Sequence, residues 1–237
     1  MKIAVVIPYY PDENTAELYT RCLDSIDSRF EVYNVIDFKH EGVSATRNRG
    51  LVEALKTADY ITFLDADDEL APDAYDSMKA AIRENPQADM IQFNHKRKLT
   101  NGVLQPRFWN RGGTYKLSKL PLLWVSSVNK IYKADLLRVI RFDNSLRHGE
   151  DELFILECLA KTRRLICSDY FTMIYHKDNP KSLSQTTAFD DLLGEQRALL
   201  RFIDGHRDDA ELCEAVRIRQ AELWNNPTYR RIMGGAE

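Results

Sequence analysis

The densest group of side chains able to do chemistry is the run of acids in ITFLDADDEL. Asp65, Asp67 and Asp68 directly follow a short strand-like stretch. Three carboxylates this close together repel one another unless a cation or hydrogen-bond donors offset their charge. An Asp-x-Asp pair at a strand end suits a hard divalent cation that also holds a diphosphate. Capping of the next helix is the plainer interpretation, but Asp68 and Asp73 could do that alone.

The elements around these acids alternate between strands and helices. Strands are predicted over residues 2–10, 30–38, 59–68 and 88–99, and helices over 15–28, 44–58 and 71–86. Such alternation predicts βαβ units and a parallel sheet. Ligands of open parallel sheets bind at the carboxyl ends of the strands, where the acids would lie.

The second half of the chain reads differently. Residues 95–120 suggest a hairpin or mobile loop, and 133–140 and 150–162 are predicted helices. One or two strands follow over 164–176, and a helical cap over 188–224. Neither a linker nor a repeat interrupts the sequence, which predicts one fused α/β unit.

Composition excludes several classes of protein. The 237 residues are 44% hydrophobic, and no apolar run approaches the roughly 20 residues of a membrane-spanning helix. Because no signal peptide is recognisable either, a cytoplasmic protein is expected. The four cysteines form no C-x-x-C pair, which argues against zinc and for reduced thiols. The lack of G-x-G-x-x-G after the first strand and of a P-loop disfavours dinucleotide and P-loop sites.

Charge is distributed unevenly along the chain. Residues 1–94 contain 9 Lys/Arg and 18 Asp/Glu, whereas residues 95–148 contain 12 and 2. Within 95–120 there is no acid, and Phe108, Trp109 and Tyr115 are interleaved with the basic residues. A solvated basic face is one interpretation, and a surface that binds an anion is the other.

Several motifs together resemble the family 2 glycosyltransferases with the GT-A fold. They are VVIPYYP, GVSATRNRGL, YITFLDADDEL, SVNKIYKADLL, GEDELF and KSLS, and they span residues 3 to about 184. The resemblance implies a mixed, mostly parallel central sheet flanked by helices, with a C-terminal helical cap. It also implies a nucleotide-sugar-binding half over 1–94, an acceptor-binding half over 95–187 and the cap over 188–237.

The same resemblance implies the donor site. Asp67 matches the position that binds Mn²⁺ or Mg²⁺, and His176 matches a late metal or diphosphate contact. Lys181 matches a segment that closes over the diphosphate. The positions expected at the nucleotide and its ribose are Pro8, Tyr9, Asp37, Arg47, Asn48 and Asp65.

Asp151 in GEDELF matches the position of the general base. An alcohol is a weak nucleophile, so a carboxylate must accept its proton as the new bond forms. An acidic first helical turn favoured by the helix dipole is the alternative interpretation of Glu150-Asp151-Glu152. The resemblance implies direct displacement with inversion, from a UDP-sugar in preference to other nucleotide sugars.

The basic region 95–120 falls where the family begins its acceptor half. An anionic or membrane-linked glycan is the first acceptor to consider. The alternative is a phage-type transferase acting on hydroxymethylated DNA bases, because cations and aromatic rings also bind nucleic acid. A catalytically inactive module that binds nucleotide or glycan is an alternative of another class. A magnesium phosphotransfer domain would need further signature residues that the sequence does not place.

Overall fold

The structure is a computed structural model of the chain. It describes residues 1–237 except 13–14, 100, 108–111, 118–125, 177–186 and 235–237. All four cysteines are buried and have free thiols, in line with the expectation of a reduced protein. None of the helices in the described part of the chain has the length and apolar character needed to cross a bilayer.

A mixed β-sheet forms the centre of the molecule. The strands of its main path are, in spatial order, β2 (Glu31–Ile36), β1 (Ile3–Tyr9), β3 (Tyr60–Phe63), β8 (Lys130–Lys133), β5 (Met90–Lys98), β9 (Arg164–His176) and β4 (Glu69–Leu70). Pairing is parallel for β2–β1–β3 and for β5–β9, whereas β8 runs antiparallel between β3 and β5. The predicted fold class, a mixed sheet with a parallel core, is confirmed.

Strand β1 shows why the sheet forms where it does. All seven of its residues are buried, as expected of a continuous apolar run in a strand covered on both faces. Pro8 and Tyr9, the last two residues of β1, lie at the carboxyl edge of the sheet, next to the end of β3.

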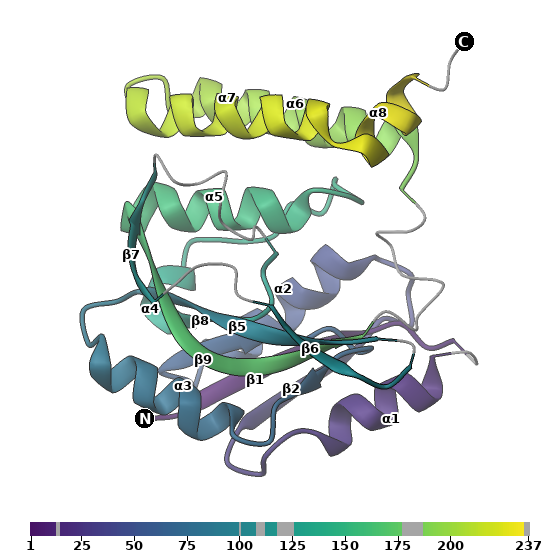
Figure 1. Ribbon diagram of the computed structural model, residues 1–237, viewed down its shortest axis with the longest axis vertical. Helices are drawn as coiled ribbons and strands as arrows, with labels where there is room; N and C mark the ends of the chain where they lie inside the picture. The colour runs from purple at the N-terminus through teal and green to yellow at the C-terminus, as the bar shows by residue number, and fades with distance from the viewer. Residues whose placement is uncertain (13–14, 100, 108–111, 118–125, 177–186, 235–237) are drawn as a thin grey trace.

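Helices cover the sheet in layers (Figure 1). Their bounds are α1 (Ala16–Asp24), α2 (Val43–Ala54), α3 (Ala74–Glu84), α4 (Ala134–Leu137), α5 (Glu150–Thr162), α6 (Phe189–Gly205), α7 (Ala210–Asn225) and α8 (Pro227–Gly234). In the view of Figure 1, α5 lies above the sheet and α6–α8 form a further layer above α5, whereas α1 and α3 lie below. The helical cap, with helical sequence predicted over 188–224, is a layer of three helices that extends to residue 234, and α6 packs on α5.

The basic region partly forms the expected hairpin. Strand β6 (Leu104–Arg107) pairs antiparallel with the end of β5, and β7 (Gly113–Lys116) pairs antiparallel with β9. Residue 94, where the two predicted halves meet, lies inside β5. The division of the chain into functional halves remains a prediction.

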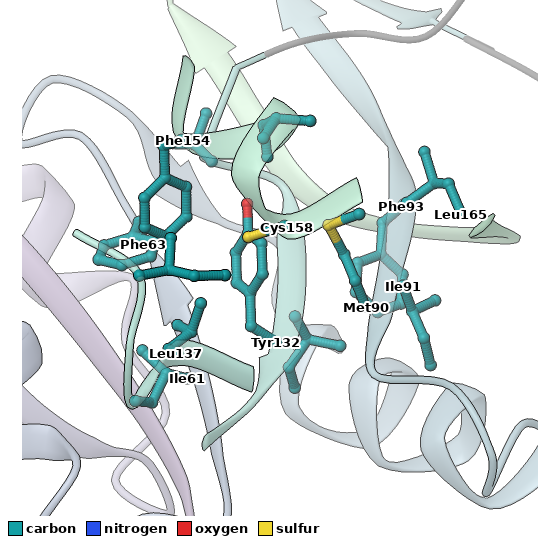
Figure 2. Packing of buried hydrophobic residues seen from close by; sticks show 14 of the residues in the cluster. Ile61, Phe63, Met90, Ile91, Phe93, Tyr132, Leu137, Phe154, Cys158 and Leu165 are labelled. Carbon is teal, nitrogen blue, oxygen red and sulfur yellow. The ribbon is translucent and has the colours of Figure 1, made fainter. Parts of the chain in front are cut away.

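An aromatic cluster attaches α5 to the sheet (Figure 2). Phe154 of α5 stacks on Phe142 with ring centroids 4.0 Å apart, and Phe63 of β3 meets both rings edge-on. Tyr132 of β8 contacts Phe63 and Phe154 as well. Phe63 is the last residue of β3, and Phe154 lies near the start of α5. This packing therefore brings the acids after β3 close to the acids that begin α5.

Gly50 allows α2 to approach the sheet closely. A Cβ at this position would lie 2.5 Å from Val6 Cγ1 and 2.9 Å from Val35 Cγ2.

We predict that Gly50→Ala lowers the free energy of unfolding. Overpacking costs about 1–3 kcal/mol, which is more than the roughly 0.5–1 kcal/mol that Ala gains over Gly in a helix. Chemical denaturation would measure this change. Gly194→Ala in α6 is the control, since its Cβ meets only Leu146 Cδ2 at 3.8 Å, and equal stability of the two variants would contradict the prediction.

Candidate active site

A cleft of about 1210 Å³ opens at the carboxyl ends of β1 and β3. Its lining comes from segments far apart in the sequence, including the ends of these strands, the starts of α2 and α5, the β5–β6 hairpin and the cap helices. The predicted site residues among its lining are Pro8, Tyr9, Asp37, Arg47, Asp65, Asp67 and Asp151. The expected metal-binding acid and the expected base therefore face the same cleft.

Arg47 of α2 connects the acids at the base of this cleft. Its Nη2 donates to Asp65 Oδ1 at 2.7 Å, and its Nη1 donates to Asp151 Oδ1 at 2.9 Å and to Glu150 Oε1 at 3.2 Å. The Arg47 side chain is only 4% exposed. Burial disfavours a charged guanidinium, but the surrounding carboxylates more than offset this and raise the pKa of Arg47. A permanent buried cation thus holds together two acidic segments that would otherwise repel.

The first turn of α5 gives Asp151 its orientation. Gly149 precedes the helix in the left-handed conformation, and three acids follow in the first turn, where the helix dipole favours negative charge. Ser126 Oγ donates to Asp151 Oδ2 at 3.3 Å, so each oxygen of this carboxylate has a donor. Burial, together with the charge of Asp151, raises the pKa of Glu150 to about 7. Glu150 is more enclosed than Asp151, and Asp151 is the better placed of the two to meet a substrate hydroxyl.

The three acids after β3 have different environments. Asp65 pairs with Arg47, and Asp67 lines the cleft, with its backbone carbonyl accepting from Arg21 Nη2 at 2.8 Å. Asp68 is buried, and its Oδ1 accepts the backbone N–H of His176 at 2.8 Å. Burial raises the pKa of Asp68 well above its usual range. Asp68 therefore connects this turn to β9, and Asp65 and Asp67 remain for the cleft.

His176 and Lys181 were both expected near the diphosphate. His176 is buried at the end of β9, with its Nε2 2.6 Å from Glu69 Oε1, and it is not among the residues that line the cleft. Its expected contact with the metal ion or the diphosphate remains a prediction. Lys181 lies outside the described residues.

Asp37 and Asn48 differ in their position relative to the cleft. Asp37 lines it, and its carboxylate accepts the backbone N–H groups of Glu41 and Gly42 at 3.0 and 2.8 Å. Burial alone would raise the pKa of Asp37, but these donors lower it. Asn48 is not among the lining residues: its amide exchanges hydrogen bonds with the backbone of Phe142, at 2.9 and 3.0 Å. Its expected position near the nucleotide remains a prediction.

The side chains in the cleft that could ligate a metal ion suit one kind of coordination. The described residues contain no group of three or more His, Cys, Asp or Glu placed to hold an ion. Mg²⁺ commonly binds to one or two carboxylates and completes its coordination with waters and substrate phosphates. The cleft carboxylate of Asp67 fits an ion that arrives with a diphosphate, since the part of the chain that the structure describes supplies no closed cage.

Part of the basic block reaches the cleft. His95, Arg97 and Arg107 line it, whereas Lys96, Lys98 and Lys116 are not among the lining residues. Burial lowers the pKa of His95 to about 4, so this imidazole is neutral at pH 7. Arg111, Lys119 and Trp109, which the sequence also suggested for the acceptor, lie outside the described residues.

The lining residues that were not found from the sequence include Arg147, His148, Glu195 and Arg219. They belong to no motif. One signal in the sequence could have identified Glu195. It occupies the apolar stripe of α6, between the buried Leu192 and Leu199 at helical spacing. A carboxylate in such a stripe indicates a buried polar contact.

Comparison with known proteins agrees with this geometry. The family model described as Glycosyl transferase family 2 matches residues 12–140, which is more than half of the chain. No curated protein sequence matches.

Solved structures of S. aureus TarS share the fold. TarS 1–349 in complex with UDP-GlcNAc matches with a TM-score of 0.79 and 18% sequence identity, over 100% of this chain and 76% of that chain. TarS 1–349 in complex with UDP matches with a TM-score of 0.74 at 18% identity, over 98% and 74% of the two chains. A longer TarS structure has a TM-score of 0.74 at 17% identity, over 98% of this chain and 45% of that chain.

The motifs, the cleft and the family model lead to the same conclusion. The mixed sheet places the acids after β3 and those that begin α5 in one cleft, and the fold matches that of a structure with a bound nucleotide sugar. The chain belongs to the family 2 glycosyltransferases and is a nucleotide-sugar-dependent enzyme of glycosyl transfer.

Proposed function

We propose that this enzyme transfers a sugar from a UDP-sugar to a hydroxyl of an anionic acceptor, with inversion and with a divalent metal ion. One observation carries the proposal: Asp67 and Asp151 line the same cleft, and Arg47 connects Asp151 to Asp65. This arrangement brings a candidate site for the donor diphosphate close to a candidate base for the acceptor.

The proposed reaction is a single displacement at the anomeric carbon. The acceptor oxygen forms a bond to this carbon as the bond to the diphosphate oxygen breaks, and the electron pair leaves with the diphosphate. Asp151 accepts the proton of the acceptor hydroxyl. A single displacement of this kind inverts the configuration, and it requires no covalent intermediate on the protein.

The donor site would occupy the part of the cleft next to β1 and β3. Asp37 lies there with Pro8 and Tyr9, whose ring stacks on that of Tyr19 with centroids 3.7 Å apart. Asp65 would face the ribose, and Asp67 would hold the metal ion with the diphosphate. When bound there, Mn²⁺ or Mg²⁺ supplies positive charge that offsets the charge developing on the leaving group. The UDP and UDP-GlcNAc complexes of TarS support UDP as the nucleotide.

The acceptor would enter beside the β5–β6 hairpin. Arg97 and Arg107 line the cleft there, and Arg147 approaches it from the loop before α5. Guanidinium groups pair well with phosphate and carboxylate. This charge favours an acceptor that carries phosphate or carboxylate groups, with a glycan as the first choice and DNA as the alternative.

The base assignment predicts a specific loss of activity. Asp151→Asn preserves the shape of the side chain but cannot accept a proton, so we expect UDP release from UDP-GlcNAc to slow by about 10²–10⁴-fold. The affinity for UDP, measured by calorimetry, should stay within about twofold. Glu150→Gln is the matched comparison and should cost less. A larger loss for Glu150→Gln than for Asp151→Asn would show that the base is a different residue.

The metal assignment predicts that binding of UDP depends on Asp67. In wild-type protein, Mn²⁺ should increase the thermal stabilisation by UDP, and a chelator should abolish that increase. Asp67→Asn should remove the effect of Mn²⁺ and slow UDP release at least about 100-fold. Asp73→Asn, an exposed acid outside the cleft, should behave like wild type. An unchanged Mn²⁺ effect in Asp67→Asn would contradict the assignment.

The acceptor assignment predicts salt-dependent binding of polyanions. A labelled phosphodiester polymer without bases should bind at low salt, and Arg107→Gln should reduce the slope of log affinity against log salt by about one. Lys116→Gln is the control, since Lys116 is exposed and belongs to the same basic block but does not line the cleft. Stronger binding of duplex DNA of equal charge would favour the DNA alternative. Lack of binding to either polymer at low salt would contradict an anionic acceptor.

A further inference from the structure

The cap helices contact the turn that precedes Asp151. Glu195 of α6 is 2% exposed, and its Oε2 lies 3.2 Å from His148 Nδ1. The same oxygen accepts the hydroxyl of Tyr229 in α8 at 3.0 Å. The hydrogen bond with Glu195 is the main cause that raises the pKa of His148. The acids of α5 and α6 around this ring (Glu150, Glu152, Asp191) also favour its charged form, and Arg219 of α7 pairs with Glu152.

Glu195 also packs directly against Gly149. A Cβ on Gly149 would lie 2.5 Å from Glu195 Cγ and 2.9 Å from its Cδ, and Gly149 has a φ of +80°. A side chain at position 149 would therefore be strained and would push Glu195 away. The carbonyl of Gly149 accepts the N–H of Leu153 at 3.0 Å, so the residue that Glu195 touches is the one from which α5 begins.

A second contact holds the other side of Asp151. Arg219 of α7 donates to both carboxylate oxygens of Glu152, at 2.9 and 3.3 Å, and the Glu152 side chain is 4% exposed. The residues on either side of Asp151 along the chain are thus held differently: Glu150 by Arg47, and Glu152 by the cap. Together with the Glu195 contacts, this means that the cap fixes where the first turn of α5 starts and how it is rotated.

We infer that Glu195 is a positioning residue for Asp151, acting through His148 and Gly149, and that the cap helices are therefore part of the catalytic apparatus. The inference rests on the proposed role of Asp151 as the base. A base must be held within a fraction of an ångström of its productive position, and a displacement of 1 Å can cost about 100-fold in rate. Arg47 and Ser126 hold the Asp151 carboxylate, and Glu195 of the cap contacts His148 and Gly149 in the turn that leads into it.

The test compares two variants that weaken the contact between α5 and the cap at opposite ends of the helix. Glu195→Gln keeps the shape of the side chain but removes its charge next to His148. Arg163→Gln removes the pairing of Arg163, just after α5, with Asp209 and Glu211. Both variants should lower the melting temperature, but only Glu195→Gln should lower kcat for UDP release from UDP-GlcNAc, by about 10–100-fold. The affinity for UDP should stay within twofold in both.

Hydrogen exchange gives a readout that does not depend on activity. The amides of residues 153–156, the first in α5 that donate helical hydrogen bonds, should exchange faster in Glu195→Gln than in wild type. Their exchange should be unchanged in Arg163→Gln. His148→Gln should shift kcat and exchange in the same direction as Glu195→Gln. It replaces Glu195→Gln in the test if that variant does not fold. Wild-type kcat and exchange in the Glu195 and His148 variants, or equal losses in Glu195→Gln and Arg163→Gln, would overturn the inference. The proposed function would be overturned instead if the wild-type enzyme released no UDP from any UDP-sugar while exchange still differed between Glu195→Gln and wild type.

Discussion

The site depends on one buried cation among acids. Arg47 contacts Asp65, Glu150 and Asp151 with a nearly inaccessible side chain. Without it, three carboxylates would face one another in a partly enclosed cleft, where their mutual repulsion is poorly screened. A guanidinium suits this position because it stays charged when buried and presents several donors in a fixed plane. The acids after β3 and the acids that begin α5 are therefore held at a set separation by one residue of α2.

The scaffold around Arg47 serves the same end. Phe63 and Phe154 pack together where β3 and α5 approach one another (Figure 2), and Phe142 contacts both rings. Arg47 itself lies over the ring of Phe142, with Cζ 5.3 Å from the ring centroid. The hydrophobic core thus brings the two acidic segments together, and the buried ion pairs fix their final geometry. The cap adds a further layer above α5 (Figure 1). Its Glu195 side chain reaches His148 in the turn before Asp151.

Local signals accounted for most of the fold. The apolar run predicted as a strand over 2–10 is β1 with one residue fewer at each end. The helices predicted over 44–58 and 71–86 are α2 and α3, which are shorter than predicted by three to five residues. The acids after β3 were predictable because a strand that ends in Asp residues places them at the edge where ligands bind. The antiparallel insertion of β8 between β3 and β5 was not predictable, since strand order depends on contacts between distant segments.

The sequence by itself determined the family, the alternation of strands and helices in the first half, and several motif residues that face the cleft, Asp67 and Asp151 among them. Only the tertiary structure decided how those residues divide their tasks. In the folded protein, Arg47 pairs with three acids and Asp68 accepts a hydrogen bond from β9. His176 lies beside Glu69, and Glu195 packs against Gly149. The physical reason is that a motif records the type and spacing of side chains along the chain. The partner of a buried charge is set by which distant segments pack against it, and local spacing does not identify those segments.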